Sequence, residues 1–220
     1  MVNISIEEVL KDKCPDLALG VIFCSVENYT YSKELWLEIE FECERIKKNY
    51  ELSTVKTQPQ IAATRYAYKR TGKDPNRYRP ATDSLYRRIV KGYELYPITV
   101  LVDLVNLVAL KSGYSIGGFD AAKVKGQVTA GIGRKNEKYE GIGRGLLNVE
   151  GLPILRDKKG GIGTPTSDEV RTAISKDTKK FFMNINGYTG KNDLLPVMDD
   201  AVELLKKYVS GNDLKTAIVI

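Results

Sequence analysis

The sequence predicts an α+β fold: a single compact domain with a strand-rich, sandwich-like core flanked by helices, most of them in the N-terminal half. Helical patterns dominate the first half of the 220 residues and short strand-like runs the second half. Such segregation is typical of α+β proteins rather than of repeated βαβ units. Most of the 19 glycines lie between Gly113 and Gly163, among the strand-like runs. No linker rich in Pro, Gly and Ser divides the chain, so we expect one domain over residues 1–220.

Local signals place the elements of the first half. Ser5 and Glu8 form a capping-box pattern, which predicts a helix that stops before Pro15. The apolar, β-branched run at 18–26 predicts a buried strand. Ser32 is expected to cap a helix with one apolar stripe. The stripe comprises Leu35, Ile39, Cys43, Ile46 and Tyr50.

Further helices are bounded by proline and glycine, which favour the first turn and the end of a helix. They are expected at 59–72, 85–90 and 97–112, the last being the most apolar. In the second half we expect strands at 127–132, 152–156, 180–186 and 214–220, and a helix at 193–208.

The chain contains no histidine, which excludes a His-bearing zinc site, a Ser-His-Asp triad and a Cys-His dyad. Its three cysteines, Cys14, Cys24 and Cys43, have wide and irregular spacing and are expected to be reduced, buried thiols. The sequence therefore implies neither a metal nor an organic cofactor.

Charge and hydropathy indicate a cytoplasmic protein whose partner can be a nucleic acid. Lys and Arg number 34 against 28 Asp and Glu, a net charge of +6, which permits contact with phosphates. The longest apolar stretch, 98–110, contains Asp103 and Asn106 and is too short to cross a bilayer. Acidic Glu7 and Glu8 stand where a signal peptide would be basic and then apolar.

The segment 65–96 is rich in arginine, lysine and tyrosine. Arginine binds phosphates as a rigid fork, and tyrosine rings offer faces on which unpaired bases stack. An RNA-binding surface that includes Arg77, Arg79, Arg87 and Arg88 is one interpretation. The other is that the tyrosines anchor helices while the charges are solvated, and the two interpretations are equally well supported.

Two further groups of polar residues allow either a structural or a functional role. Asp103 and Asn106 lie three residues apart, hence on one face of an apolar helix, where they brace backbone or line a polar pocket. We favour the bracing role. The segment 160–169 combines glycines with Thr, Ser, Asp and Glu; its end is either a ligand-binding loop or a helix start capped by Ser167.

The segment YPITVLVDLVN at 96–106, followed by GYSIGGFD at 113–120, resembles the editing module of the bacterial phenylalanyl-tRNA synthetase β chain. That family shows Pro-Ile, then Val-Asp-x-x-Asn on an apolar helix, then Gly, and then His-x-Phe-Asp. The sequence at 78–80, with Ser84 and the pair Arg87 and Arg88, is similar to stand-alone relatives of the module. The resemblance is strongest over residues 77–180.

The resemblance implies a tRNA-binding protein that recognises an aromatic amino acid and hydrolyses tyrosine from mischarged phenylalanine tRNA. It places Asn106 in the substrate pocket and assigns recognition of the tyrosine hydroxyl to Asp168 or Glu169. The family's histidine falls on Gly117, so water would be oriented by substrate hydroxyls, by backbone groups near Gly117 and Gly118 or by a carboxylate. No catalytic residue follows from the family pattern.

Three hypotheses remain at the level of sequence. The chain is an aminoacyl-tRNA deacylase acting in trans, a non-catalytic module that binds tRNA or an aromatic amino acid, or a structural subunit. Loss of the histidine favours the second hypothesis over the first. A tRNA affinity that falls steeply with salt would favour the first two over the third.

Overall fold

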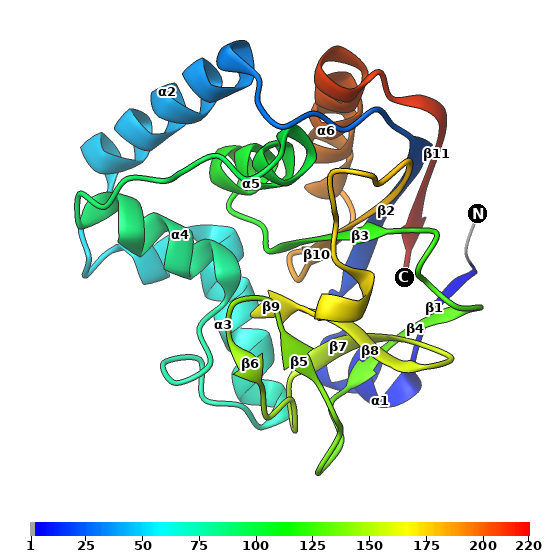
Figure 1. Cartoon of the computed structure of the whole chain (residues 1–220). Coiled ribbons are helices and arrows are strands. Elements are labelled where there is room, and N and C mark those ends of the chain that lie inside the picture. Colours follow the sequence, from blue (N-terminus) through cyan, green and yellow to red (C-terminus); the bar gives the residue numbers. More distant parts are fainter. Residues whose placement is uncertain (1–2) are drawn as a thin grey trace.

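Two β-sheets form the centre of the computed structural model, which describes residues 3–220 (Figure 1). The first sheet has the order β1-β4-β7-β8-β9, and its strands are antiparallel except for β1 and β4. The second has the antiparallel order β11-β2-β10-β3. Strands β5 and β6 pair separately. The strands are β1 (Ile4–Ile6), β2 (Ala18–Ser25), β3 (Ile116–Asp120), β4 (Val128–Ile132), β5 (Glu140–Gly141), β6 (Gly145–Leu146), β7 (Pro153–Asp157), β8 (Gly160–Thr164), β9 (Ser167–Asp168), β10 (Lys180–Gly187) and β11 (Asn212–Val219).

Helices surround the sheets, and most of them precede residue 113. They are α1 (Glu8–Lys13), α2 (Lys33–Asn49), α3 (Pro59–Thr71), α4 (Ala81–Val90), α5 (Val100–Ser112) and α6 (Leu194–Val209), with short 3-10 helices η1 (Val55–Thr57) and η2 (Val170–Thr172). This arrangement confirms the predicted α+β class, with a sandwich-like core and helices mainly in the N-terminal half.

Strand alternation divides the core into two layers, because successive side chains of a strand point to opposite faces. On β10, Phe182 packs between the sheets, where its ring stacks on Phe23 at a centroid distance of 4.5 Å and lies 5.1 Å from that of Phe119. Met183 and Ile185 face the other way, into the helical layer. The polar residues of β10 therefore lie on the face between the sheets.

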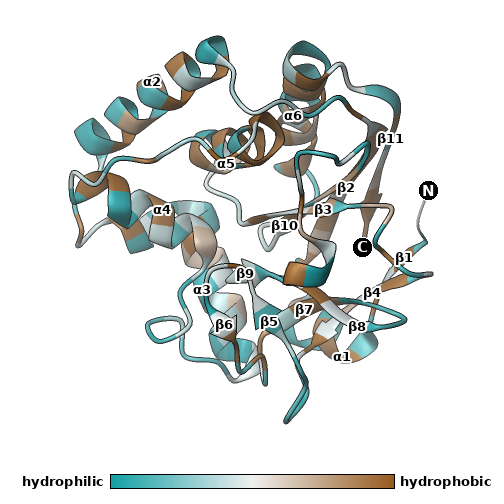
Figure 2. Cartoon of the chain, in the orientation of Figure 1, coloured by the Kyte–Doolittle hydropathy of each residue, from teal (hydrophilic) through white to brown (hydrophobic). Residues whose placement is uncertain are grey.

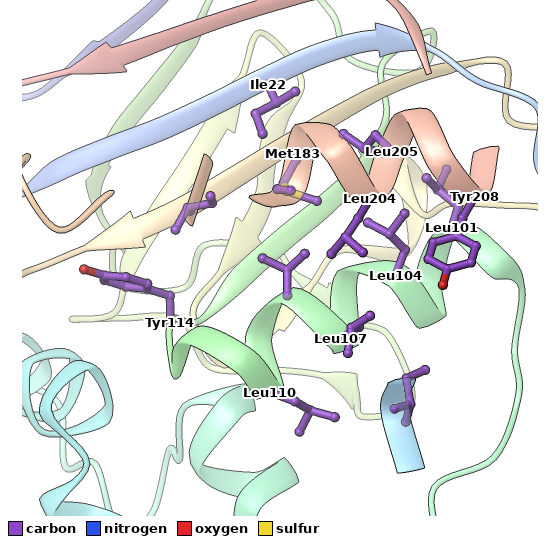
Figure 3. Close-up of a cluster of buried hydrophobic side chains, with 14 of the residues drawn as sticks. Ile22, Leu101, Leu104, Leu107, Leu110, Tyr114, Met183, Leu204, Leu205 and Tyr208 are labelled. Carbon is purple, nitrogen blue, oxygen red and sulfur yellow. The ribbon is translucent and has the colours of Figure 1, made fainter. Parts of the chain in front are cut away.

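Helix α5 lies at the centre of the helical layer and is among the most apolar parts of the chain (Figure 2). Figure 3 shows leucines of α5 packed with Leu204, Leu205 and Tyr208 of α6 and with Ile22 and Met183 of the sheet. Thr99 caps the helix, and Gly113 ends it with a left-handed backbone (φ 82°). Packing on both α6 and the sheet fixes the position of α5 next to β3.

Asp103 braces the start of α5, as the sequence predicts. Its carboxylate accepts hydrogen bonds from Trp36 Nε1 (2.9 Å) and from the backbone N–H of Ile98 (3.1 Å). Burial raises the pKa of Asp103, and the two hydrogen bonds oppose that shift. These two hydrogen bonds join α2 to the loop before α5.

Several local predictions are confirmed. Ser32 accepts a hydrogen bond from the backbone N–H of Leu35 and caps α2. Strands β2, β4, β7, β10 and β11 begin and end within two residues of the predicted bounds, and so do α3 and α6. Cys14, Cys24 and Cys43 are free thiols, the first two buried.

Other local predictions are wrong. Ser5 caps no helix; it lies in β1, opposite Thr129, and α1 begins only at Glu8. Ser167 lies in β9 rather than at a helix start, and Glu169 accepts the capping hydrogen bond of η2. Pairing outweighs the local capping signal at both serines, with the distant strand β4 at Ser5 and with the neighbouring strand β8 at Ser167.

Candidate functional site

Two adjacent glycines of β3 bring its backbone close to elements on both sides. A Cβ at Gly117 would lie 2.6 Å from Cζ of Phe119 and 3.2 Å from Oδ1 of Asp168. A Cβ at Gly118 would lie 3.0 Å from Val105 of α5 and from Ile174. Carbon atoms cannot approach to 2.6 Å, so the ring of Phe119 fills the space that a side chain at position 117 would need.

The backbone of β3 holds the carboxylate of Asp168. The N–H of Gly118 donates a hydrogen bond of 3.0 Å to Oδ2 of Asp168. Burial raises the pKa of Asp168 to about 7, although the hydrogen bond from Gly118 opposes the shift. A carboxyl group with this pKa exchanges its proton near neutral pH, as a general base requires.

A small cavity with mostly apolar walls and a few polar groups adjoins Asp168 between the two sheets. It has a volume of about 10 Å³ and is lined on its polar side by Asp168, Asn184, Asn186, Thr164 and Tyr188. A volume of ~10–15 Å³ on this measure accommodates about one water molecule. The cavity is therefore large enough for a water and too small for an amino-acid side chain.

Asn184 gives this cavity an unsatisfied acceptor. It is fully buried, and its amide nitrogen donates to Oδ1 of Asn186 (3.1 Å), whose own amide donates to the carbonyl of Ser115 (2.9 Å). Oδ1 of Asn184 has no partner among the described residues. A buried acceptor without a partner costs ~1–3 kcal/mol, which a bound water would relieve.

Of the residues that the sequence selects, Gly117, Gly118 and Asp168 come together in the structure. The carboxylate of the adjacent Glu169 is engaged elsewhere, because its Oε2 accepts a hydrogen bond from the backbone N–H of Arg171 (2.9 Å). Asn106 is half-buried on α5, and its neighbour in the sequence, Val105, packs on Gly118.

Sequence reasoning missed the two asparagines of the site. Asn184 and Asn186 alternate with apolar residues in β10, and Asn184 pairs with Gly117 across the sheet. The alternation Phe182, Asn184, Asn186 was the available signal, since it places three side chains on one strand face. Only the register between β3 and β10 connects them to Asp168.

The four arginines predicted to bind tRNA have different surroundings. Arg87 and Arg65 both pair with the fully buried carboxylate of Asp83, at 2.6 and 2.7 Å. Arg88 is exposed, donates to the carbonyl of Glu94 and lies over the rings of Tyr93 and Tyr96. Arg77 is exposed and Arg79 half-buried.

The tyrosines of segment 65–96 also divide into two groups. Tyr68 and Tyr86 are buried. The hydroxyl of Tyr68 shares a hydrogen bond with Oγ1 of Thr166, and the hydroxyl of Tyr86 donates to the carbonyl of Leu110. Tyr66, Tyr93 and Tyr96 expose 61%, 60% and 66% of their surface. Tyr68 and Tyr86 thus anchor helices, whereas RNA binding by the exposed rings stays a prediction.

Within residues 3–220 there is no group of three or more His, Cys, Asp or Glu side chains that could hold a metal ion. No helix in the same range is long and apolar enough to span a membrane.

The raised pKa of Asp168 predicts a pH-dependent stability. Below pH ~4 the carboxyl of Asp168 is protonated in both the folded and the unfolded chain. Between pH ~4 and ~7 only the folded chain keeps this proton. The free energy of unfolding should therefore fall as pH rises through this window, by at most ~1.4 kcal/mol per pH unit, and level off above it. Urea unfolding from pH 4 to 8 should show a flatter profile for Asp168→Asn than for wild type; equal slopes would contradict the assignment.

Comparison with known proteins identifies relatives of the chain. A family model described as the B3/4 domain matches residues 63–219. The β subunit of phenylalanine–tRNA ligase from Fusobacterium nucleatum is 29% identical over 106 residues, which are 47% of this chain and 13% of that protein. The chain thus spans a small part of this relative's length.

A crystal structure of an N-terminal fragment of the phenylalanyl-tRNA synthetase β subunit from Pyrococcus horikoshii aligns with 99% of this chain and 50% of that fragment, with 17% identity and a TM-score of 0.47. The family match covers well over half of the chain and includes β3, Asp168 and β10. The chain belongs to the B3/4 domain family.

Proposed function

We propose that this chain binds aminoacylated tRNA and hydrolyses the ester of a mischarged aromatic amino acid, acting in trans as one domain in the cytoplasm. Membership of the B3/4 family and similarity to synthetase β subunits support a role in translation. The observation that carries the proposal is Asp168, with one oxygen on the N–H of Gly118 and a water-sized cavity beside it.

In the proposed reaction the cavity holds the attacking water and the amino acid stays outside it. Asp168 accepts a proton from the water as the water oxygen attacks the carbonyl carbon of the ester. The bond between that carbon and the ribose oxygen then breaks, and the ribose oxygen takes the proton from Asp168. The products are the free amino acid and deacylated tRNA.

Asn184 would orient the water, because its unpartnered Oδ1 can accept one hydrogen while Asp168 accepts the other. This arrangement needs no histidine. A histidine side chain at position 117 would collide with the ring of Phe119. Asn106, by its resemblance to the family pattern, would contact the amino-acid portion.

We expect the wild-type chain to release tyrosine from tyrosyl-tRNA(Phe) faster than spontaneous hydrolysis does. Asn106→Ala should reduce that rate about tenfold or more, since misplacing a substrate near a reacting centre is costly. The exposed Asn212→Ala provides a matched control. Equal rates for wild type and buffer would refute the deacylase; equal rates for wild type and Asn106→Ala would remove Asn106 from the site.

The second candidate is a module that binds tRNA without hydrolysis. The ring of Phe119 in the space beside Gly117 favours it, since the family's histidine has no replacement there. Retention of tRNA that weakens steeply with salt, with no release of tyrosine, would select this candidate.

A further inference from the structure

A second set of depressions lies on the surface of α3, on either side of Tyr66. An open groove of about 580 Å³ is lined by Lys56, Thr57, Arg65, Tyr66 and Lys69, with Ala62 and Asn76. A smaller pocket of about 70 Å³ is lined by Lys13, Tyr66, Arg70 and residues of α3 and the loop after α1. The exposed ring of Tyr66 borders both.

The cations around Tyr66 are largely free to meet an anion. Lys56, Lys69 and Arg70 are exposed, and Arg70 lies over the Tyr66 ring at 5.8 Å. Arg65 is the exception, because Asp83 neutralises it at 2.7 Å. Asp16 is the one acidic residue that lines either depression among the described residues.

An exposed aromatic ring between cationic grooves is the arrangement that binds a single-stranded nucleic acid, with phosphates on the cations and a base on the ring. The surroundings of Tyr93 differ in charge. The depression beside that ring is lined by Glu40, Glu44 and Glu94, with Lys47 as its one cation within residues 3–220.

The smaller pocket also adjoins the cavity of the proposed reaction. Leu17 and Tyr188 line both the pocket beside Tyr66 and the cavity that contains Asp168. Tyr188 therefore separates an outer basic pocket from the inner cavity that Asp168 lines. A single-stranded nucleic acid bound at Tyr66 would have its end close to Tyr188.

We propose that the surface of α3 centred on Tyr66 binds the single-stranded acceptor end of tRNA, with its phosphates on Lys56, Lys69 and Arg70 and one base stacked on the Tyr66 ring. This inference rests on the proposed function, and it assigns the principal RNA contact to α3 rather than to the four arginines that the sequence selects.

The test is equilibrium binding of uncharged tRNA(Phe) to the full chain at several salt concentrations. Tyr66→Ala should weaken binding about 5- to 100-fold, because stacking on one ring is lost. Lys69→Ala should reduce the salt slope by ~0.7, the value for one contact to a single strand. The matched controls are Tyr93→Ala, a comparably exposed tyrosine, and Lys206→Ala on α6, and both should bind like wild type.

Removal of the single-stranded 3′ end from the tRNA should weaken binding to wild type but change little for Tyr66→Ala. If wild type binds tRNA and Tyr66→Ala binds as tightly as Tyr93→Ala, the α3 assignment is wrong while the proposed function stands. If wild type binds no tRNA at any salt concentration, the proposed function fails as well. Equal affinity for intact and trimmed tRNA would also overturn the assignment to the acceptor end.

Discussion

Asp168→Asn should lower the rate of tyrosine release from tyrosyl-tRNA(Phe) by about 10²–10⁴-fold, the usual contribution of a general base. The amide keeps the size of the carboxyl and can still accept the hydrogen bond from Gly118, but it cannot take a proton from water. Because burial opposes the charge of Asp168, the variant should fold at least as stably as wild type at neutral pH. The loss should therefore appear in the chemical step rather than in stability.

The measurement is single-turnover release at saturating protein, which separates chemistry from tRNA affinity. Glu169→Gln serves as the matched control, since that carboxylate is engaged by the N–H of Arg171 rather than by β3. A rate for Asp168→Asn within threefold of wild type would remove Asp168 from catalysis.

Phe119→Ala should reduce the free energy of unfolding by about 3–5 kcal/mol, the cost of truncating a fully buried phenylalanine. The ring packs on Phe182 and occupies the space beside Gly117 and Gly163, neither of which has a side chain to refill it. The truncation should leave a cavity between the sheets. Equilibrium unfolding in urea measures the change.

The control for this change is Phe41→Ala on α2, where 69% of the side chain is exposed and the cost should be small. A loss below ~1 kcal/mol for Phe119→Ala would mean that the sheets collapse around the gap and that the space at Gly117 is not fixed by the ring.

Elements with strong local signals were predictable from the sequence. The β-branched run of β2, the serine cap of α2, and the proline and glycine that bound α3 each act within a few residues. Strands β3 and β8 carry no such signal, because their glycines lower β propensity. The backbone of β3 is held by register with β10, far along the chain, and that of β8 by register with its hairpin partner β7.

The candidate site was predictable only in part for the same reason. Gly117, Gly118 and the choice between Asp168 and Glu169 followed from the resemblance to a known module. The structure distinguishes the two acids, since Asp168 meets β3 and Glu169 caps η2. The place of Asn184 in the cavity and the pocket beside Tyr66 depend on packing between β10, α1 and α3, and no local sequence pattern predicts such contacts.

The pH dependence of tyrosine release by the wild-type chain, after the spontaneous rate at each pH is subtracted, tests the central claim most directly. Asp168 must be ionised to accept a proton, so this catalysed rate should rise with pH to a plateau with its midpoint near the pKa of about 7, and Asp168→Asn should lack the transition. A catalysed rate of zero at every pH, or the same transition in both proteins, would contradict an ester hydrolase based on Asp168.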